Sequence, residues 1–417
     1  MFDNGNLHKL DECLACGSTD LVLTLDLGKQ PLANSYKKTK EEDQERFPLA
    51  INRCQNCYHV QLTHAVNPDL MFKEYLYVSG TSFTMREHFK WFAQYAVETF
   101  TTYGNHVSPY NVLDIGCNDG TQLEEFHKLD VLAVGIDPAK NLYETSSKKV
   151  NAKIYCDYFN MDWSKKTDPG VFDILTAQNV FAHNSDPIDF LLTARNVMHD
   201  ESLLFIQTSQ ADMILNGEFD TIYHEHISFY NVNSMNELCS RVALYLVDVI
   251  KCPLHGTSYI FVISKNPKFA RPSNIQNLIA MERKAGLLTD ETYIEYAEKC
   301  EKITKELREL VERYQSLEVG FNVVGYGAAA KGMTLLNYSG IRPDFIVDDN
   351  ELKQGRFTPG SSVPIKSSDA LNDLESATLF IPLAWNFFDE IYNKIKRTHS
   401  NKYDLFLKYF PKVETKE

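Results

Sequence analysis

Four cysteines near the N-terminus have the spacing expected of ligands for a single metal ion. Cys13 and Cys16 form one CxxC pair, and Cys54 and Cys57 form a second, with 37 residues between the pairs. Two such pairs deliver four thiolates to the corners of a tetrahedron, the geometry that Zn²⁺ prefers in structural sites. A redox pair or incidental cysteines are the alternatives, but a redox CxxC normally occurs once, at a helix start. Because four thiolates fill the coordination shell, we expect structural zinc.

A glycine-rich turn follows the first strand-like segment of the central region. Asp114, Gly116 and Gly120 lie at this turn, Asp137 ends the next apolar segment, and Asp157 follows the third. Glycine lets the backbone approach a ligand closely, and a carboxylate after the second strand is placed to accept hydrogen bonds from two ribose hydroxyls. Asp157 is placed to receive an adenine amino group. This ordered set resembles the class I S-adenosylmethionine methyltransferase pattern more than the dinucleotide fingerprint; a turn in an unrelated α/β domain is the alternative.

Aromatic, histidine and acidic residues are concentrated between residues 219 and 230. Methylating carbon requires a base of near-neutral pKa, which is the property of histidine, and this segment holds two, His224 and His226. Glu225 is a carboxylate placed to orient a neighbouring imidazole, and Tyr223 is placed to donate a hydrogen bond to a developing enolate oxygen. The alternative is a loop whose histidines only satisfy hydrogen bonds.

A second glycine-rich turn lies in the C-terminal third. Gly325, Gly327 and Ala330 stand between a strand-like and a helix-like segment, and the next strand ends in Asp348. This is close to a dinucleotide fingerprint, and a helix N-terminus at such a turn binds an anion, most simply a diphosphate. Lys331 lies in the first turns of that helix, where its charge favours the same ligand. A Rossmann-like module that binds nothing is the alternative.

The segments around these motifs predict an α/β protein of three domains. Residues 1–75 are rich in loops, and residues 76–265 alternate short apolar strands with helix-length stretches, which indicates a parallel sheet. A polar stretch at 266–274 opens the third domain, 266–417, in which a helix-periodic segment at 275–317 precedes a second α/β pattern.

Composition limits the classes of function. The 417 residues carry a net charge of −14, which argues against extended binding to nucleic acid because that needs a local excess of Lys and Arg. No apolar run is long enough to span a bilayer, and the N-terminus has no apolar signal core. We therefore expect a cytoplasmic protein without membrane partners, in which the remaining five cysteines are free thiols.

Taken in order, the motifs resemble the sugar-nucleotide C-methyltransferases of unusual deoxysugar pathways, of the C-3 methyltransferase type. The resemblance covers essentially the whole chain. It rests on the two CxxC pairs and on Pro31-Leu-Ala-Asn-Ser-Tyr36, Tyr75-x-Tyr77-x-Ser79-Gly80, Leu113-Asp-Ile-Gly-Cys-Asn-Asp-Gly120, Tyr223-x-Glu-His226, Gly325-Tyr-Gly-Ala-Ala-Ala-Lys331 and Ile381-Pro-Leu-Ala-Trp-Asn-Phe387.

The resemblance implies a zinc-binding domain, a central S-adenosylmethionine domain and a Rossmann-like domain that holds a nucleotide-linked 4-keto-deoxysugar. It implies that His226 removes the C-3 proton beside Tyr223 and Glu225, and that the enolate takes the methyl group. Tyr77 and Ser79 would line the cofactor or sugar pocket. Asn179, at the end of the fourth strand-like segment, completes the expected cofactor contacts.

Two departures from the family leave the substrate open. Gln207-Thr208 stands where the family often has Glu-Val, and the segment from His255 to Ile260 lacks the family's arginine. Both lie near the expected substrate, so a guanosine-linked sugar is an alternative to a thymidine-linked one. An NAD-dependent oxidoreductase and a non-catalytic nucleotide-sugar-binding protein are the rival functions.

Overall fold

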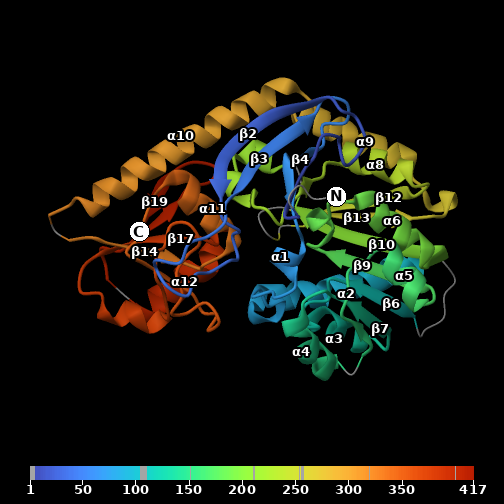
Figure 1. Cartoon of the computed structure of the whole chain (residues 1–417), viewed down its shortest axis with the longest axis horizontal. Helices are drawn as coiled ribbons and strands as arrows, with labels where there is room; N and C mark the ends of the chain where they lie inside the picture. The colour runs from blue at the N-terminus through green and yellow to red at the C-terminus, as the bar shows by residue number, and fades with distance from the viewer. Residues whose placement is uncertain are drawn as a thin grey trace.

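The computed structural model describes residues 5–103, 110–150, 152–209, 212–252, 254, 258–318, 320–399 and 401–417. Figure 1 shows two α/β regions facing each other, the C-terminal region in orange to red and the central region in green to cyan. The N-terminal strands, in blue, lie above and between them. The chain therefore has the α/β architecture in several parts that its sequence predicts.

The N-terminal region is built on two small antiparallel sheets. The strands and short helices are β1 (Leu7–Lys9), β2 (Leu21–Gln30), β3 (Phe47–Cys54), β4 (Val60–Leu62), β5 (His64–Val66), α1 (Asp69–Phe72) and η1 (Ser79–Thr81). One sheet pairs β1 with β5, and the other has the order β11-β4-β3-β2, in which β11 (Ser228–Phe229) comes from far along the chain. The Tyr-His-Glu-His segment, residues 223–226, ends one residue before β11. The pairing of β11 with β4 therefore holds that segment against the N-terminal sheet.

The central region is a seven-stranded sheet with the order β12-β13-β10-β9-β6-β7-β8. The strands are β6 (Asn111–Ile115), β7 (Leu132–Ile136), β8 (Ile154–Tyr155), β9 (Phe172–Gln178), β10 (Met198–Ser209), β12 (Tyr245–Cys252) and β13 (Ser258–Ser264). The five adjacent strands β10, β9, β6, β7 and β8 run parallel, as the sequence predicts. Strands β13 and β12 extend the sheet in antiparallel pairing. Every residue of β13 is buried, because it lies inside the sheet and is covered on both faces.

The helices and 3-10 segments of this region are α2 (Phe83–Tyr103), α3 (Thr121–His127), α4 (Lys140–Val150), α5 (Met161–Thr167), η2 (Phe181–His183), α6 (Pro187–Asn196), α7 (Met213–Asn216), η3 (Phe219–Thr221) and α8 (Val232–Arg241). Helix α2 precedes β6, and the others follow strands of the sheet. Because β6, β7 and β9 are parallel, the turns after them share one edge of the sheet. Ligands of open α/β sheets bind at such an edge.

The C-terminal region has a six-stranded sheet with the order β16-β15-β14-β17-β18-β19. Its elements are α11 (Ala330–Ser339), α12 (Phe388–Thr398), β14 (Asn322–Tyr326), β15 (Phe345–Val347), β16 (Ile365–Lys366), β17 (Thr378–Pro382), β18 (Leu405–Lys408), β19 (Glu414–Lys416), η5 (Ser368–Asp373) and η6 (Trp385–Phe387). The five adjacent strands β16, β15, β14, β17 and β18 are parallel, and β19 pairs with β18 in antiparallel fashion. The predicted Rossmann-like pattern is confirmed, with two short strands, β16 and β19, that the sequence did not indicate.

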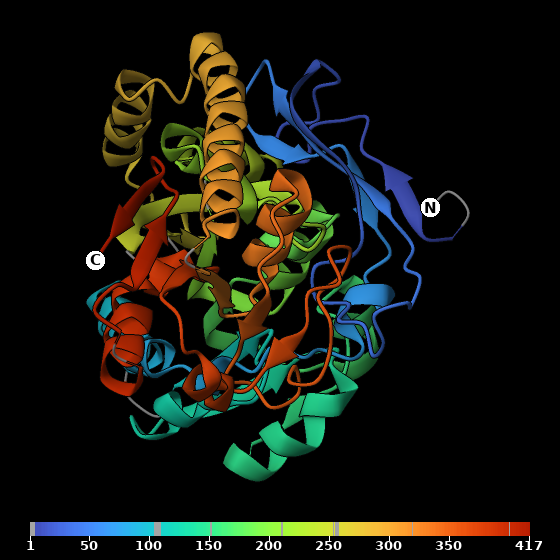
Figure 2. The same cartoon turned by 90° about the vertical axis from the view of Figure 1, so that its left-hand side faces the viewer.

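The segment between the two large sheets forms two helices and one 3-10 segment: η4 (Pro267–Phe269), α9 (Pro272–Lys284) and α10 (Asp290–Gln315). Gly286, at a φ of +89°, lies in the break between α9 and α10. The buried residues of α10 recur at helical spacing and include Tyr296, Cys300, Ile303 and Leu307. Figures 1 and 2 show α10 beside β2 along one side of the molecule, so this helix packs against the N-terminal sheet.

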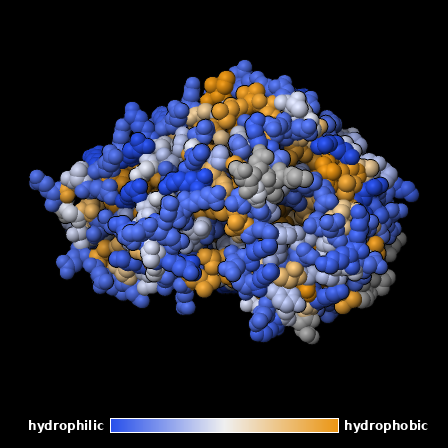
Figure 3. Space-filling view, in the orientation of Figure 1, coloured by the Kyte–Doolittle hydropathy of each residue, from blue (hydrophilic) through white to orange (hydrophobic). Residues whose placement is uncertain are grey.

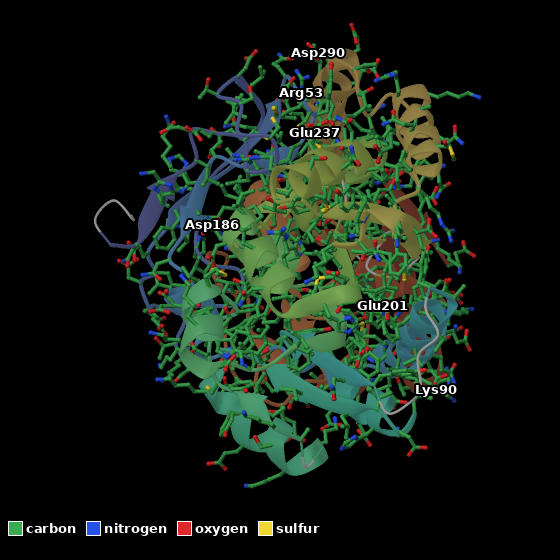
Figure 4. All side chains as sticks on the ribbon, turned by 90° about the vertical axis from the view of Figure 1, so that its right-hand side faces the viewer. Arg53, Lys90, Asp186, Glu201, Glu237 and Asp290 are labelled. Carbon is green, nitrogen blue, oxygen red and sulfur yellow. The ribbon has the colours of Figure 1, made fainter. Side chains whose placement is uncertain are left out.

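An ion pair joins the start of α10 to the N-terminal region. The guanidinium of Arg53 is buried, donates to the Asp290 carboxylate at 2.5 Å and stacks over Tyr58 and Tyr293. Figure 4 shows Arg53 and Asp290 next to each other. A single hydrophobic core continues through this junction, because Leu25, Ile222, Tyr296, Val323 and Met333 belong to one cluster.

The surface is mainly polar on the face that Figure 3 shows, with hydrophobic side chains in scattered patches. Across the part of the chain that the structure describes, no helix has both the length and the apolar character needed to cross a bilayer.

Candidate active site

The four predicted metal ligands converge, although 37 residues separate the two pairs. The sulfur atoms of Cys13, Cys16, Cys54 and Cys57 lie within 4.8 Å of one another, and the Cys13–Cys57 and Cys16–Cys54 distances are both 3.6 Å. A tetrahedron with Zn–S bonds of about 2.3 Å has S–S edges of about 3.8 Å. Backbone N–H groups of Cys16 and Asn56 point at Cys13 Sγ and Cys54 Sγ, each at 3.4 Å. These residues therefore fit a structural zinc ion.

One cavity of about 800 Å³ is shared by all three regions of the chain. Of the predicted cofactor, catalytic and substrate residues, those that line it are Tyr77, Ser79, Asp114, Gly116, Asp137, Asp157, Asn179, Tyr223, Glu225, His226, Gly327 and Lys331. Gly120 and Gly325 do not line it. The edge of the central sheet and the edge of the C-terminal sheet therefore face the same space.

The turn after β6 is held by the carboxylate of Asp137. Its two oxygens accept the backbone N–H groups of Asn118 and Ala139, at 2.9 and 2.8 Å. The side chain of Asn118 in turn accepts from Ser79 N at 3.0 Å and donates to Tyr77 O at 3.1 Å. This chain of bonds brings the predicted cofactor contacts Tyr77 and Ser79 against the glycine-rich turn.

The glycines of this turn are required by its backbone. Gly116 has a φ of +73°, and a Cβ there would lie 3.0 Å from the Val180 side chain. Gly120 has a φ of +79° and sits behind the cavity, where a Cβ would lie 3.4 Å from Ser146. Other residues rarely adopt this conformation, so the turn depends on both glycines.

Asp114 is a buried acid below the turn. Asp114 lies opposite Thr176 in the pairing of β6 with β9, and its carboxylate accepts a hydrogen bond from the Thr176 hydroxyl at 2.7 Å. Burial raises the pKa of Asp114 to about 7, and the nearby Asp137 acts in the same direction. Burial also raises the pKa of Asp137. The turn thus presents acceptors and negative charge, and Lys149 pairs with its Asp119 carboxylate at 3.1 Å.

The hydrogen bonds of His226 determine which ring nitrogen carries the proton. Nδ1 lies 3.0 Å from the carbonyl oxygen of Thr221, which can only accept, so Nδ1 carries the hydrogen. Nε2 then has the lone pair of the neutral imidazole and lies 2.6 Å from the hydroxyl of Tyr223, which donates to it. The tautomer leaves Nε2 as the basic nitrogen, on the side of the cavity.

Glu225 is bonded away from the imidazole that it was expected to orient. Its two oxygens accept the Asn34 side-chain amide and, at 2.8 Å, the Tyr75 hydroxyl. Burial raises the pKa of Glu225, whereas these two hydrogen bonds and the charge of Lys353 lower it. The group that contacts Nδ1 of His226 is the Thr221 carbonyl.

His183 is a site residue that the sequence interpretation missed. Its ring stacks on His226, with centroids 5.2 Å apart and planes 24° from parallel, and it lines the cavity. Burial lowers the pKa of His183 to about 4, so the ring is neutral at neutral pH. Its position soon after β9, at the sheet edge that binds ligands, was the available signal.

The turn after β14 has the same plan as the first turn. Gly327 has a φ of +83°, and the Asp348 carboxylate accepts the backbone N–H of Ala328 at 2.6 Å. Gly325 lies within the strand, where a Cβ would come within 2.8 Å of Ile346, so it serves packing between strands. Lys331, in the first turn of α11, has Nζ 5.0 Å from the Trp385 ring.

Lys353 is a second cation at this turn, and nothing in its sequence context indicated it. Its side chain is buried, and Nζ donates to Ala328 O at 2.7 Å and lies 3.8 Å from the Asp348 carboxylate. Burial by itself lowers the pKa of Lys353, but Tyr36 and Asp348 outweigh it and the net shift is upward. The neighbouring Asp349 is paired with Lys394 at 2.6 Å.

The two departures from the family pattern have different outcomes. Gln207 is buried, and its side-chain oxygen accepts from His88 Nε2 at 2.7 Å. His255 lies outside the residues that the structure describes.

Comparisons with known proteins agree with this site. Three family models match in succession: a zinc binding domain at residues 13–72, a methyltransferase domain at 86–249 and a C-methyltransferase C-terminal domain at 253–410. The C-methyltransferase NovU of Streptomyces niveus is 29% identical over 406 residues, covering 95% of this chain and 94% of that protein.

More distant matches reach only part of the chain. A ubiquinone biosynthesis O-methyltransferase of Glaesserella parasuis is 30% identical over 104 residues, 23% of this chain and 44% of that protein. A solved S-adenosylmethionine-dependent methyltransferase of Clostridium acetobutylicum is 12% identical, with a TM-score of 0.35, over 42% of this chain and 91% of that one. The chain belongs to the family of S-adenosylmethionine-dependent C-methyltransferases that join a zinc-binding domain, a methyltransferase domain and a C-methyltransferase C-terminal domain.

Proposed function

We propose that this C-methyltransferase adds a methyl group to C-3 of a nucleotide-linked 4-keto-deoxysugar. The observation that carries the proposal is the state of His226 in the shared cavity: Nδ1 is bonded to Thr221 O, and Nε2 is the basic nitrogen. A hydrogen next to a ketone is acidic enough for an imidazole to remove, and carbon methylation needs that step.

The proposal divides the work among three domains, residues 1–75, 76–265 and 266–417. The acidic turn of the central domain would hold S-adenosylmethionine, with Asp137 on the ribose hydroxyls and Asp157 on the adenine. The turn from Gly325 to Lys331 would hold the diphosphate, because a helix N-terminus and two cations favour an anion there. The sugar then extends from the second turn toward the first.

The chain's own residues supply the proton transfer. Nε2 of His226 takes the C-3 proton, and the electrons of that C–H bond move to the C-4 oxygen as an enolate. Tyr223, whose hydroxyl donates to Nε2 before substrate enters, is placed to turn its donor to the C-4 oxygen. Bound S-adenosylmethionine supplies an electrophilic methyl group, which C-3 accepts while S-adenosylhomocysteine leaves. His226 then releases its proton to water.

The surroundings of His226 favour the neutral base. The stacked ring of His183 is neutral at neutral pH because burial lowers its pKa, so it adds no positive charge beside His226. The bond from Nδ1 to Thr221 also stabilises the imidazolium that forms, since a carbonyl oxygen is an acceptor for N–H in both states.

The proposal is tested with His226→Ala and a thymidine diphosphate-linked 4-keto-6-deoxysugar, with the guanosine-linked sugar in parallel. We expect turnover to fall by about 10²–10⁴-fold, the usual effect of losing a general base, with unchanged affinity for S-adenosylmethionine. The wild-type chain should also exchange the C-3 hydrogen with D₂O, as followed by NMR, and the variant should not.

His127→Ala is the matched control, because His127 is exposed and lies at the end of α3, away from the cavity. Turnover within tenfold of wild type in His226→Ala would remove this residue as the base. Absence of C-3 exchange and methyl transfer in the wild type with both sugars would refute the substrate.

A further inference from the structure

A short segment of the zinc-binding domain contacts both the proposed catalytic cluster and the proposed nucleotide-binding turn. We call residues 34–37 the interknuckle segment, because they lie between the two CxxC pairs. Asn34 and Tyr36 stand two positions apart, yet Asn34 contacts Glu225 and Tyr36 contacts Ala328. The partners of these two side chains belong to the catalytic cluster and to the second glycine-rich turn.

Asn34 gives one of the two hydrogen bonds that the Glu225 carboxylate receives. Its amide nitrogen donates to Oε1, while Tyr75 donates to Oε2. An amide donor favours the ionised form of a carboxylate, which burial disfavours. Asn34 therefore contributes, with Tyr75, to the orientation of Glu225 and to the stability of its charged form.

Tyr36 and Lys353 hold the carbonyl of Ala328 between them. The Tyr36 hydroxyl donates to Ala328 O at 2.5 Å, Lys353 Nζ donates to the same oxygen at 2.7 Å, and the ammonium lies over the Tyr36 ring at 5.2 Å. Because Asp348 accepts the N–H of Ala328, both polar groups of this peptide position are bonded. The second turn is thus shaped partly by a residue of the zinc-binding domain.

Lys37 docks the segment on the C-terminal domain. Its backbone exchanges two hydrogen bonds with Phe357, both at 2.9 Å, and its buried side chain donates to Ser362 Oγ at 2.9 Å. Within the segment the backbone N–H of Tyr36 donates to Asn34 O at 3.1 Å, so a shift at Lys37 would be passed on toward Asn34.

We propose that the interknuckle segment is a positioning element that couples nucleotide binding at the second glycine-rich turn to the placement of Glu225. The inference rests on the proposed function and assigns the zinc-binding domain a part in turnover as well as in folding. Asn34 and Tyr36 act through Glu225 and Ala328, so they are positioning residues.

Several charged and titratable groups face Glu225 and enter the design of the test. Tyr36 and Tyr75 approach from the zinc-binding domain, Tyr223 from the methyltransferase domain and Lys353 from the C-terminal domain. His226 is the neighbour in sequence. Asn34 and Tyr75 donate the hydrogen bonds that the carboxylate receives from the described residues, so a change at Asn34 alters Glu225 before it affects His226.

The first measurement is made on Asn34→Ala. Loss of the amide donor should raise the pKa of Glu225, so the acidic limb of the kcat–pH profile moves to higher pH and kcat falls about tenfold. If the segment couples the two sites, the same variant should also bind thymidine diphosphate more weakly, because it is Tyr36 and not Asn34 that bonds to the second turn. Asn34→Gln retains the donor and should recover part of kcat.

The second measurement is made on Tyr36→Phe. We expect the dissociation constant of thymidine diphosphate, measured by calorimetry, to rise about fivefold, and the acidic limb to move in the same direction as in Asn34→Ala. The losses in kcat/KM of the double variant should be smaller than the product of the single losses, because either change releases the same segment. Lys38→Ala, at the next and exposed position, and Tyr245→Phe, at an exposed tyrosine, are the controls.

The coupling is refuted if Asn34→Ala binds thymidine diphosphate like the wild type and Tyr36→Phe keeps the wild-type pH profile. Melting temperatures near that of the wild type show that each variant is folded, and Asn34→Gln replaces Asn34→Ala if the latter is not. If the wild type methylates no 4-keto sugar, the proposed function fails, and the binding of thymidine diphosphate to Asn34→Ala still decides the coupling.

Discussion

The two glycine-rich turns of this chain have one construction and opposite charge. In the first, Asp137 accepts the backbone N–H groups of Asn118 and Ala139, at 2.9 and 2.8 Å. In the second, Asp348 accepts those of Ala328 and Asn350, at 2.6 and 2.8 Å. Each carboxylate thus closes the turn from the end of the neighbouring strand.

The surroundings make the turns suitable for different ligands. Asp114 and Asp137 leave the first turn acidic, which suits a ligand with a sulfonium, an ammonium and ribose hydroxyls. At the second turn Lys353 lies 3.8 Å from Asp348, and Lys331 stands at the start of α11. We expect a diphosphate to be attracted there and repelled from the first turn. The comparison indicates that turns of one backbone construction can suit different ligands, depending on the charges near them.

The largest expected effect comes from Gly116→Ala. A Cβ at a φ of +73° and 3.0 Å from Val180 forces the first turn to move. We expect the affinity for S-adenosylmethionine to fall about 100-fold, from strain of about 1–3 kcal/mol, while binding of thymidine diphosphate is unchanged. Gly170→Ala is the control, because Gly170 has a φ of +83° and open space around it. Binding of S-adenosylmethionine within threefold of wild type would show that the turn does not hold it.

A smaller and opposite effect is expected from Lys331→Gln. Removing one of the two cations should weaken thymidine diphosphate about tenfold and make its binding less sensitive to salt, with S-adenosylmethionine binding unchanged. Titration calorimetry at two ionic strengths measures both quantities. Lys148→Gln, at an exposed lysine of α4, controls for the loss of net charge. Equal weakening of both ligands would mean that the turns are not separate sites.

The smallest expected effect concerns the buried acid of the first turn. Burial raises the pKa of Asp114 from 3.8 to about 7, so the folded chain keeps a proton that the unfolded chain releases above about pH 4. This contribution to stability is complete below pH 4 and is lost as the pH rises toward 7. Asp114→Asn should therefore flatten the fall in unfolding free energy by about 1 kcal/mol per pH unit between pH 5 and 7.

Urea unfolding at pH 5, 6 and 7 measures that slope. Asp130→Asn is the control, because Asp130 is exposed and an asparagine tolerates its positive φ. Identical slopes in Asp114→Asn and the wild type would mean that Asp114 is ionised in the folded chain throughout this range.

Spacing along the chain was enough wherever a function depends on neighbouring residues. The CxxC pairs predicted a cluster that the structure brings within 4.8 Å. Asp114, Gly116, Asp137, Asp157 and Asn179 were found because parallel strands deliver their carboxyl ends to one edge. The same rule predicted Lys331, which lines the cavity, and Gly325, which does not. The absence of a side chain at Gly325 allows neighbouring strands to pack closely.

Contacts between segments that are far apart in the sequence could not be predicted from the spacing of residues along the chain. Asn34 and Glu225 are 191 positions apart, and Tyr36 and Ala328 are 292 apart. Lys353 stands in a turn with no motif, and β11 joins the catalytic segment to a sheet built almost entirely from residues before 67.

Residue types and local periodicity were therefore sufficient for the fold class and the zinc-binding cysteine cluster, and they led to the two glycine-rich turns and His226, whose roles stay predictions. The folded chain alone decided that both turns open into one cavity, that Nδ1 of His226 carries the proton and that Glu225 is held by Asn34 and Tyr75. The physical reason is that glycine conformation and metal-ligand geometry act over a few residues. The tautomer of a buried ring and the ionisation of a buried carboxylate depend instead on donors and acceptors that other domains supply.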